Sequence, residues 1–547
     1  MTESKRPGVL AFDLMARAEE TPDFPVVTFE NDPHPHEVLT FADIVLKGNC
    51  LAKSLEKMGL GRGDVFSMVM RNHPETVLSM YASSVLGAVL VPIDPRSKGK
   101  KLAYQIQDSG SKGVIFTAEC MDSVSEALSS LPEVKTYGCL YNEEFGVAPS
   151  PDFPNLREVL EGPEVPPFSP GQHDINDQFV MMYTSGATGN PKGINIRFSR
   201  MQLAVFLAEN AWQYSWDDRL YTGLSLTHGN ALFVTLYPAL YGRIPAVISR
   251  KFTKSRIWDI CRKYGCTTFS LLGGMMTGIY SEPVRPNDGD NSVSMVISAG
   301  TPRGIWESFE KRFNVVIHEW YGAMEGGLAH NPPAVGPRGS FGKPLKGMIE
   351  MKVVREDDSE CEPGEIGELI SRNLVGETKV EYHGKPEASE EKTRGGWLRT
   401  GDMVHRDENG WLYFDFRQGG GLRRQGDFIM PEYVEGVIAE HQDVNDVCVF
   451  GIEAASGAPG ESDLVAAVVP MPGVNLDIKG IFEHCAARLE RNSVPSYIQV
   501  LIEIPKTASE KNLDRLLKDA FRPDSSGVHQ LQNYSLPEGK ELRRCRK

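Results

Sequence analysis

The sequence predicts an α/β fold, with a large N-terminal domain of layered α/β subdomains and a small, mobile α+β domain at the C-terminal end. Apolar runs of strand length alternate with helix-length segments between residues 65 and 131, which is typical of parallel β-α-β units. A glycine run at residues 419–421 then precedes a region of mixed strands and helices. With 547 residues, the chain also exceeds the length that one hydrophobic core normally supports.

The N-terminal third shows the clearest alternation. We expect helical structure with one polar break over residues 10–60, and a surface connection over residues 149–172, which are rich in proline and acidic side chains. Between them the expected strands are 65–70, 89–93 and 113–116, and the expected helices are 74–86, 102–109 and 121–131. Right-handed crossovers between parallel strands bury both faces of a sheet, so we predict a doubly wound layer.

The remaining elements divide at the glycine run. Before it we expect strands at 179–182, 194–196, 267–272, 293–298, 315–320 and 410–417, a strand running into a loop over 221–230, and helices at 201–213, 231–241, 257–264 and 306–313. After it we expect strands at 447–452 and 464–469 and helices at 478–489 and 513–521. The predicted domains are therefore residues 1–417 and a lid formed by residues 418–547, with a hinge at 418–421.

Composition limits the classes of function. The formal net charge of −15 disfavours binding to nucleic acid, while a local basic pocket can still hold a nucleotide. The start of the chain is polar, and no run of about 18 apolar residues is present, so we expect a cytoplasmic protein without stable membrane insertion. Nine scattered cysteines indicate reduced core residues, and we interpret Cys261 and Cys266 as packing rather than as zinc ligands.

A glycine- and hydroxyl-rich loop lies between two expected strands. Residues 183–193 read Tyr-Thr-Ser-Gly-Ala-Thr-Gly-Asn-Pro-Lys-Gly. Glycine lets the backbone approach a ligand closely, hydroxyl groups bond to phosphate oxygens, and lysine adds a positive charge. The residues expected to hold a polyphosphate are Thr184, Ser185, Gly186, Thr188, Gly189 and Lys192. Gly193 follows the lysine where a P-loop has Ser or Thr, so this is a different kind of phosphate loop.

Three further turns carry candidate nucleotide ligands. Gly300 and Thr301 follow a strand, at the edge where open α/β sheets bind ligands. In the segment 321–327, Tyr321 offers an aromatic face for adenine, Gly322 is a further candidate nucleotide-binding residue, and Glu325 offers a hard oxygen ligand for Mg²⁺. In the segment 397–402, which we place at the end of a strand, the carboxylate of Asp402 can accept hydrogen bonds from both ribose hydroxyl groups.

These segments, in this order, resemble the adenylate-forming enzymes, the superfamily that includes acyl-CoA synthetases, luciferases and peptide-synthetase adenylation domains. The similarity extends from about residue 42 to residue 511 and also includes Arg417, the turn at Gly426 and the segment Pro505-Lys506-Thr507-Ala508-Ser509-Glu510-Lys511. Glu510 stands where glycine is usual, and glycines replace the usual charged residue after Arg417. The overall pattern is most similar to that of the medium- and long-chain, carnitine-type and steroid-acid CoA ligases.

The resemblance implies roles for individual residues. Lys511 would be the catalytic lysine, with Thr184 and Glu325 also catalytic and binding Mg²⁺, while Arg417 contacts the nucleotide and Gly426 serves the second half-reaction. His228 would line the carboxylate substrate, although a histidine that is merely hydrogen-bonded at the end of a strand is an equal alternative. Gly273 and Gly274 would border the acyl pocket or merely form a tight turn. Arg423 and Arg424 would attract CoA phosphates or form a solvated turn.

The activity implied by the resemblance is a ligase reaction with a small-molecule carboxylic acid, ATP and CoA, and with Mg²⁺ as cofactor. The acid and ATP would give an acyl-adenylate and pyrophosphate, after which the C-terminal domain rotates and a thiol attacks the adenylate. Two alternatives stay open: an acyl-AMP ligase that delivers its product to a carrier protein or to oxygen, and a nucleotide-binding homologue without turnover. A homodimer is compatible with the sequence.

Overall fold

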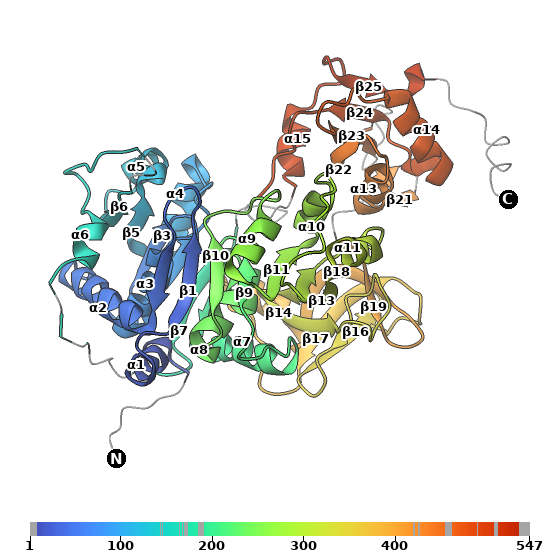
Figure 1. Ribbon diagram of the computed structural model, residues 1–547. Helices are drawn as coiled ribbons and strands as arrows, with labels where there is room; N and C mark the ends of the chain where they lie inside the picture. The colour runs from blue at the N-terminus through green and yellow to red at the C-terminus, as the bar shows by residue number, and fades with distance from the viewer. Residues whose placement is uncertain are drawn as a thin grey trace.

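The computed structural model describes residues 8–534 except 143, 145, 164, 167, 169–172, 184–190, 419–421, 425–426, 455–461, 490 and 508–511. Figure 1 shows a blue-to-green N-terminal region built on two sheets, a yellow third sheet below it, and a red C-terminal unit at one end. The predicted α/β class is confirmed. Among the described residues, no helix has both the length and the apolar character needed to cross a bilayer.

The first sheet has the strand order β6-β5-β3-β4-β7-β8. Its strands are β3 (Val65–Val69), β4 (Val89–Ile93), β5 (Ser111–Thr117), β6 (Lys135–Leu140), β7 (Gln178–Tyr183) and β8 (Gly193–Arg197). Its connecting helices are α3 (Pro74–Leu86), α4 (Gly99–Asp108), α5 (Met121–Ser129) and the short α6 (Leu156–Leu160). β3 pairs in parallel with β4 and β5, which confirms the predicted parallel units, and β8 returns antiparallel to β7.

The second sheet has the order β15-β14-β13-β12-β11-β9-β10-β1-β2. Its strands are β1 (Pro25–Glu30), β2 (Glu37–Thr40), β9 (Leu220–Thr222), β10 (Ala246–Ser249), β11 (Thr268–Leu272), β12 (Met295–Ala299), β13 (Val316–Ala323), β14 (Gly326–Asn331) and β15 (Lys343–Pro344). The helical segments around it are α1 (Leu10–Glu20), α2 (Phe41–Lys57), α7 (Phe198–Asn210), the π-helix η3 (Ala231–Leu236), α8 (Tyr237–Gly242), α9 (Ile257–Tyr264), α10 (Gly273–Tyr280) and α11 (Trp306–Phe313).

The prediction of helical structure across residues 10–60 is wrong in its middle, where β1 and β2 form the edge of the second sheet. Val26, Val27 and Phe29 are buried in β1, which pairs in parallel with β10. That partner lies more than 200 residues later, so the contact that stabilises β1 leaves no local sequence pattern. The helix expected after it begins at Phe41, where Thr40 and Asp43 form a capping box.

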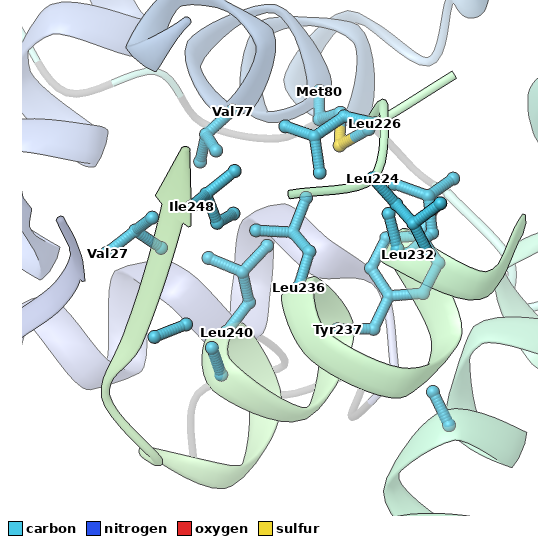
Figure 2. Close-up of a cluster of buried hydrophobic side chains, with 14 of the residues drawn as sticks. Val27, Val77, Met80, Leu224, Leu226, Leu232, Leu236, Tyr237, Leu240 and Ile248 are labelled. Carbon is cyan, nitrogen blue, oxygen red and sulfur yellow. The ribbon is translucent and has the colours of Figure 1, made fainter. Parts of the chain in front are cut away.

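The core between the two sheets is built around α3. Every residue of this helix is buried, because it packs against its own sheet on one side and against the second sheet on the other. Figure 2 shows Val77 and Met80 of α3 facing Leu236 of η3 and Ile248 of β10. This shared core fixes the two sheets relative to one another, since their apolar side chains are removed from water together.

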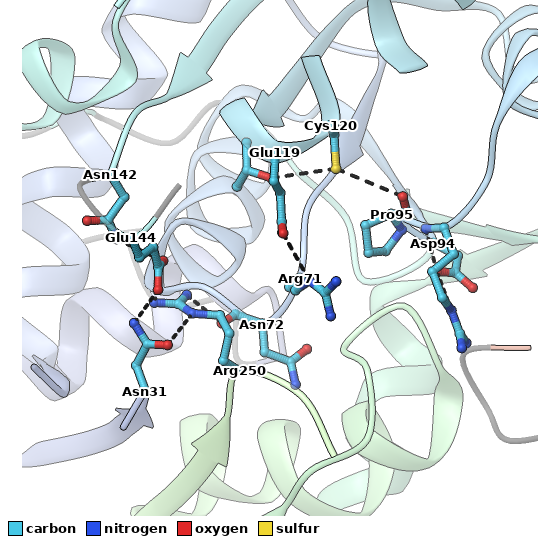
Figure 3. A network of polar contacts seen from close by, with 12 residues as sticks. Asn31, Arg71, Asn72, Asp94, Pro95, Glu119, Cys120, Asn142, Glu144 and Arg250 are labelled. Carbon is cyan, nitrogen blue, oxygen red and sulfur yellow. Dashed lines mark hydrogen bonds and ion pairs between the residues drawn. The ribbon is translucent and has the colours of Figure 1, made fainter. Parts of the chain in front are cut away.

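A buried polar network reinforces the same junction (Figure 3). The side-chain amide of Asn72, just after β3, donates to the carbonyl oxygens of Leu224 and Ser249, each at 2.8 Å. Arg250 donates to the carbonyl of Asn72 at 2.8 Å and lies 3.3 Å from the carboxylate of Glu144. Buried charges are stable only when they are paired, so this network favours one arrangement of the sheets.

The third sheet has the order β16-β17-β18-β19 and forms the base of the candidate site. Its strands are β16 (Ile349–Val354), β17 (Gly367–Asn373), β18 (Leu398–Arg406) and β19 (Leu412–Arg417), and α12 (Pro386–Lys392) precedes β18. We predicted that Asp402 ends a strand, but β18 continues through it to Arg406. Gly401 has a positive φ of 74° just before Asp402, so the local backbone is irregular although the strand continues.

The C-terminal unit is α+β, as predicted, and has its own core. Its elements are β20 (Leu422–Arg424), β21 (Asp427–Ile429), α13 (Pro431–Ala439), β22 (Val444–Glu453), β23 (Ser462–Pro470), α14 (Ile478–Arg488), β24 (Tyr497–Val500), α15 (Asp514–Ala520) and β25 (Val528–Gln530). Val434, Leu464 and Ile481 are fully buried in this core. The eight cysteines of the described residues are buried free thiols, as expected for core positions, and Cys545 lies outside that part.

Candidate active site

The centre of the candidate site is a hydrogen-bonded group on β13, β18 and β19. Tyr321 donates its hydroxyl hydrogen to Oδ2 of Asp402 at 2.5 Å, and Arg417 Nη1 donates to Oδ1 at 2.8 Å. The ring of Tyr321 packs 4.8 Å from that of Phe341, between centroids. The structure therefore brings together three residues that the sequence suggested separately, and Gly322 follows Tyr321 in β13. A buried carboxylate with fixed donors is preorganised to accept hydroxyl hydrogen bonds.

Glu325 lies beside this group, in the turn that joins β13 to β14. Its Oε1 accepts a hydrogen bond of 3.1 Å from the hydroxyl of Tyr382, whose pKa is raised by burial. The ammonium of Lys192 lies 4.9 Å from the centre of the same Tyr382 ring. Lys192 and Glu325, predicted from separate motifs, thus share one aromatic neighbour. Sequence reasoning missed Tyr382 because its segment, Glu381-Tyr382-His383, shows no periodic pattern.

The five other phosphate-loop residues lie outside the described part of the chain: Thr184, Ser185, Gly186, Thr188 and Gly189. Both strands that flank them are described. β7 and β8 form an antiparallel pair in which Tyr183 is opposite Gly193. The segment of Tyr382 runs alongside β8, since Ile194 forms a bridge with Tyr382 and His383 donates its N–H to the carbonyl of Gly193. The β7–β8 hairpin is therefore attached directly to the neighbourhood of Glu325.

The turn at Gly300 is organised by a carboxyl group that sequence reasoning did not identify. Glu319 Oε1 accepts from the backbone N–H of Gly300 at 2.6 Å, and Oε2 accepts from that of Thr301 at 3.2 Å. Burial raises the pKa of Glu319 to about 8, while these hydrogen bonds lower it. Gly300 has a φ of 81°, and a Cβ at Gly273 would lie 1.9 Å from its carbonyl oxygen. Only glycine at 273 permits this approach of the two turns.

The residues suggested for the substrate lie on two sides of the nucleotide turns. Gly273 and the exposed Gly274 begin α10 next to the Gly300 turn. β9 ends at Thr222, earlier than expected, and half-buried His228 lies in the turn before η3. The Nδ1 atom of His228 accepts from the backbone N–H of Asn230 at 3.2 Å. Its neighbour Gly229 packs on Met324, the residue before Glu325, because a Cβ at 229 would lie 2.3 Å from the Met324 sulfur.

The C-terminal candidates are only partly described. Lys511 and Gly426 lie outside the described residues, although Lys506 forms a bridge with Asn512 and pairs with Asp446 at 2.6 Å. Arg424 fits neither the solvated turn nor the CoA-binding interpretation. Its guanidinium donates to the carbonyl oxygens of Asn492 and Val494 within the C-terminal unit, and burial lowers its pKa. The guanidinium of Arg424 therefore stabilises the C-terminal unit itself.

The donor set around Glu325 fits Mg²⁺. Its Oε2 atom accepts no hydrogen bond from a described residue, so one hard oxygen remains available next to Lys192. The described residues contain no group of three His, Cys, Asp or Glu side chains able to hold a metal on their own. Mg²⁺ is commonly bound by one or two carboxylates together with substrate phosphates and water, and a single glutamate suits that mode.

Comparisons with known proteins cover nearly the whole chain. The family model described as AMP-binding enzyme matches residues 14–374, and the one described as AMP-binding enzyme C-terminal domain matches residues 433–511. A medium/long-chain-fatty-acid–CoA ligase of Mycobacterium marinum is 27% identical over 483 residues, which cover 87% of this chain and 91% of the relative. Long-chain fatty acid transport protein 1 of Bos taurus is 27% identical over 517 residues, or 88% of this chain and 78% of that protein.

Solved structures confirm the fold. An anthranilate CoA ligase in complex with anthranoyl-AMP superposes with a TM-score of 0.81 at 21% identity, covering 95% of this chain and 99% of that one. The o-succinylbenzoate CoA synthetase of Bacillus subtilis, in complex with its acyl-adenylate intermediate, gives a TM-score of 0.77 at 23% identity, with 93% and 98% covered. The likeness extends over both the N-terminal region and the C-terminal unit.

Proposed function

Because this chain belongs to the AMP-binding enzyme family, we propose that it is an AMP-forming acyl-CoA ligase. ATP and a carboxylic acid form an acyl-adenylate and pyrophosphate, and the thiol of CoA then displaces AMP to give the thioester. The observation that carries the proposal is the convergence of Lys192, Tyr321, Glu325, Asp402 and Arg417, from segments more than 200 residues apart, on one region.

In this proposal the N-terminal domain, residues 1–417, holds the nucleotide. Asp402 accepts from the ribose hydroxyl groups, and the ring of Tyr321, followed by Gly322, offers the face on which adenine stacks, next to Gly300 and Thr301. Arg417 stays paired with Asp402 and adds positive charge near the sugar. The phosphates lie toward Lys192 and the loop that contains Thr184, Ser185, Gly186, Thr188 and Gly189.

Glu325 and Thr184 would hold Mg²⁺, which when bound neutralises charge on the phosphates and orients them. Lys511, carried by the lid of residues 418–547, would neutralise negative charge that builds on the α-phosphate during attack by the carboxylate. Rotation about residues 418–421 would then remove Lys511 and present the turn at Gly426 to the thiol. Such a rotation lets one site first exclude water from a reactive anhydride and later admit the second substrate.

The substrate class is proposed from the relatives and from the walls of the site. The M. marinum relative is named a ligase of medium- and long-chain fatty acids, so we favour a fatty acid of that range as the carboxylate. His228, Gly273 and Gly274 would border the acyl group, since they surround the turns at Glu325 and Gly300. We also propose a cytoplasmic location for this acidic and hydrophilic chain, which has a net charge of −15 and a mean hydropathy of −0.29.

The proposal is tested by incubating the protein with Mg-ATP, CoA and a panel of carboxylic acids from short to long chain. We expect AMP, pyrophosphate and one acyl-CoA to appear in equal amounts with the preferred acid. Lys511→Ala should abolish adenylate formation while retaining most of the thiolysis of a supplied acyl-adenylate. Absence of AMP and of thioester with every acid would contradict the proposal, and hydroxamate trapping without consumption of CoA would indicate delivery to another acceptor.

A further inference from the structure

The ammonium group of Lys392, at the end of α12, is directed at β18, the strand that carries Asp402. Its Nζ donates to the carbonyl oxygen of Thr400 at 3.2 Å. The same oxygen accepts a weak hydrogen bond of 3.5 Å from Arg417 Nη2. Two cations therefore converge on one backbone oxygen, two residues before Asp402. Arg417 is paired with Asp402, so the charge of Lys392 is the one that this carbonyl oxygen, with only a partial charge, leaves unbalanced.

The nearby carboxylates in the described part of the chain do not form ion pairs with Lys392, because each of them has other partners. Among the described residues, Lys392 forms no ion pair, and its one hydrogen bond is to Thr400. Asp402 is engaged by Tyr321 and Arg417. Glu368 Oε1 accepts from the N–H of Gly401, and its Oε2 lies 3.5 Å from Arg399. An ammonium group has three donor hydrogens, so a partly buried lysine with a single acceptor lacks partners.

Other lysines of the same region are paired in the ordinary way. Lys385, at the other end of α12, lies 3.7 Å from Asp108, and Lys379 lies 2.8 Å from Glu381. Lys392 differs from both in its burial, which lowers its pKa, although Glu325, Asp402 and Glu368 act in the opposite direction. Its charge is therefore close enough to Glu325 and Asp402, on the two sides of the candidate site, for both carboxylates to influence it.

We propose that Lys392 binds the nucleotide's α-phosphate, as a fixed cation of the N-terminal domain. This inference rests on the proposed placement of ribose at Asp402 and of the metal-bound phosphates at Glu325, because the α-phosphate joins these two parts of ATP. The ammonium is held by Thr400 and keeps two hydrogens to donate to phosphate oxygens. AMP retains the same phosphate, so Lys392 binds it after pyrophosphate has left.

Lys392 and Lys511 therefore have separable roles. Lys511 belongs to the lid and is proposed to act only while the adenylate forms. Lys392 belongs to the N-terminal domain, so its contact with the α-phosphate persists through both half-reactions. Replacement of Lys392 should weaken the binding of ATP, acyl-adenylate and AMP alike, whereas replacement of Lys511 should affect mainly the first step.

The test compares Lys392→Met and Lys392→Arg with Lys379→Met as a matched control on an exposed lysine. Isothermal titration calorimetry measures the affinities for AMP and for adenosine, which lacks the phosphate. We expect Lys392→Met to weaken AMP binding by about 10-fold to 100-fold, as for a lost charged hydrogen bond, and to leave adenosine binding within about twofold. Lys392→Arg, which keeps the charge, should retain most of the AMP affinity, and Lys379→Met should match the wild type.

Two results would overturn the inference: unchanged AMP affinity in Lys392→Met, or equal losses for AMP and adenosine, which would indicate a role in folding alone. If Lys392→Met does not fold, Lys392→Gln takes its place, because it also removes the charge, and a structural role predicts that AMP and adenosine affinities change together. Both measurements need neither acid nor CoA. A phosphate-specific loss without turnover of any acid would therefore contradict the ligase proposal while supporting the role of Lys392.

Discussion

Tyr321 donates a hydrogen bond to Asp402 over 2.5 Å and thereby connects β13 of the second sheet to β18 of the third. Arg417 approaches the other oxygen of the same carboxylate from β19. The position of Asp402 is thus fixed by two strands besides its own. A carboxylate held in this way needs little rearrangement to accept hydroxyl groups of a ligand, which favours tight and oriented binding.

Asp402→Asn should weaken nucleotide binding without abolishing the fold. The amide keeps the size of the side chain, but it removes the negative charge and leaves Arg417 without its ion-pair partner. We expect adenosine and ATP to bind about 10-fold to 100-fold more weakly, since a hydrogen bond to a charged group is typically lost. Calorimetric titration of adenosine measures the effect. Glu408→Gln, in the exposed turn after β18, is the control, and equal adenosine affinity in both variants would refute the assignment.

Glu325→Gln should impair the first half-reaction through the metal. Glutamine can still accept the hydrogen bond from Tyr382, so the turn should keep its shape. Without the charge, we expect the exchange of pyrophosphate into ATP to slow by about 100-fold or more, with partial recovery at high Mg²⁺. The rate of pyrophosphate–ATP exchange, measured for the wild type and for Glu325→Gln over a range of Mg²⁺ concentrations, tests this prediction. Tyr382→Phe, which leaves the carboxylate in place, should lose much less activity, and an unaltered Mg²⁺ dependence of Glu325→Gln would count against a metal role.

Asp108 should help to position the phosphate loop. Its carboxylate accepts from the hydroxyl groups of Tyr183, at 2.8 Å, and Tyr104, at 2.9 Å, and Lys385 lies 3.7 Å away. Tyr183 immediately precedes the loop residues, so this contact links α4 to the end of β7. We expect Asp108→Asn to raise the KM for ATP several-fold and to lower the free energy of unfolding by about 1–2 kcal/mol.

Steady-state kinetics and urea unfolding separate the two effects of Asp108→Asn. Tyr183→Phe should raise the KM similarly, because it removes the same hydrogen bond without disturbing Lys385. The double variant should then be less impaired than the sum of the single variants. Asp122→Asn, on the exposed face of α5, serves as the control. A loss of stability with an unchanged KM would restrict Asp108 to a structural role.

Local patterns were sufficient to predict much of the fold. β3, α3 and β4 follow one another with clear hydrophobic runs, and the parallel unit they form was predicted almost to its bounds. β1 was missed because its partner β10 is distant in sequence. The continuation of β18 past Asp402 was missed because a glycine such as Gly401 is typical of a turn. In the structure Gly401 takes a positive φ, and the strand continues beyond it.

The site shows the same division between local and tertiary information. Tyr321, Glu325, Asp402 and Lys192 could each be suggested from their own motif, but their convergence depends on how the sheets pack. No local sequence pattern indicated that Tyr382, Glu319 or Lys392 belongs to the site. Lys392 follows Ser389-Glu390-Glu391 and has the appearance of a solvated helix surface, and only the tertiary structure places its ammonium beside Thr400.

Glu319 should make the stability of the protein depend on pH between about pH 4.5 and pH 8. Burial raises its pKa from 4.5 to about 8, so at pH 6 the folded protein binds a proton there that the unfolded chain does not. This contribution is complete below about pH 4.5 and is lost as the pH rises through about 8. From pH 6 to pH 9 it should cost the wild type about 3 kcal/mol of unfolding free energy.

Glu319→Gln cannot lose a proton, and its amide oxygen can still accept from the N–H groups of Gly300 and Thr301. The variant should therefore lose less stability than the wild type between pH 6 and pH 9, as measured by urea unfolding at both values. Glu435, whose pKa burial raises to about 7, contributes to the pH dependence of both proteins, so only their difference reports on Glu319. Identical losses in the wild type and in Glu319→Gln would show that Glu319 is ionised in the folded state throughout this range.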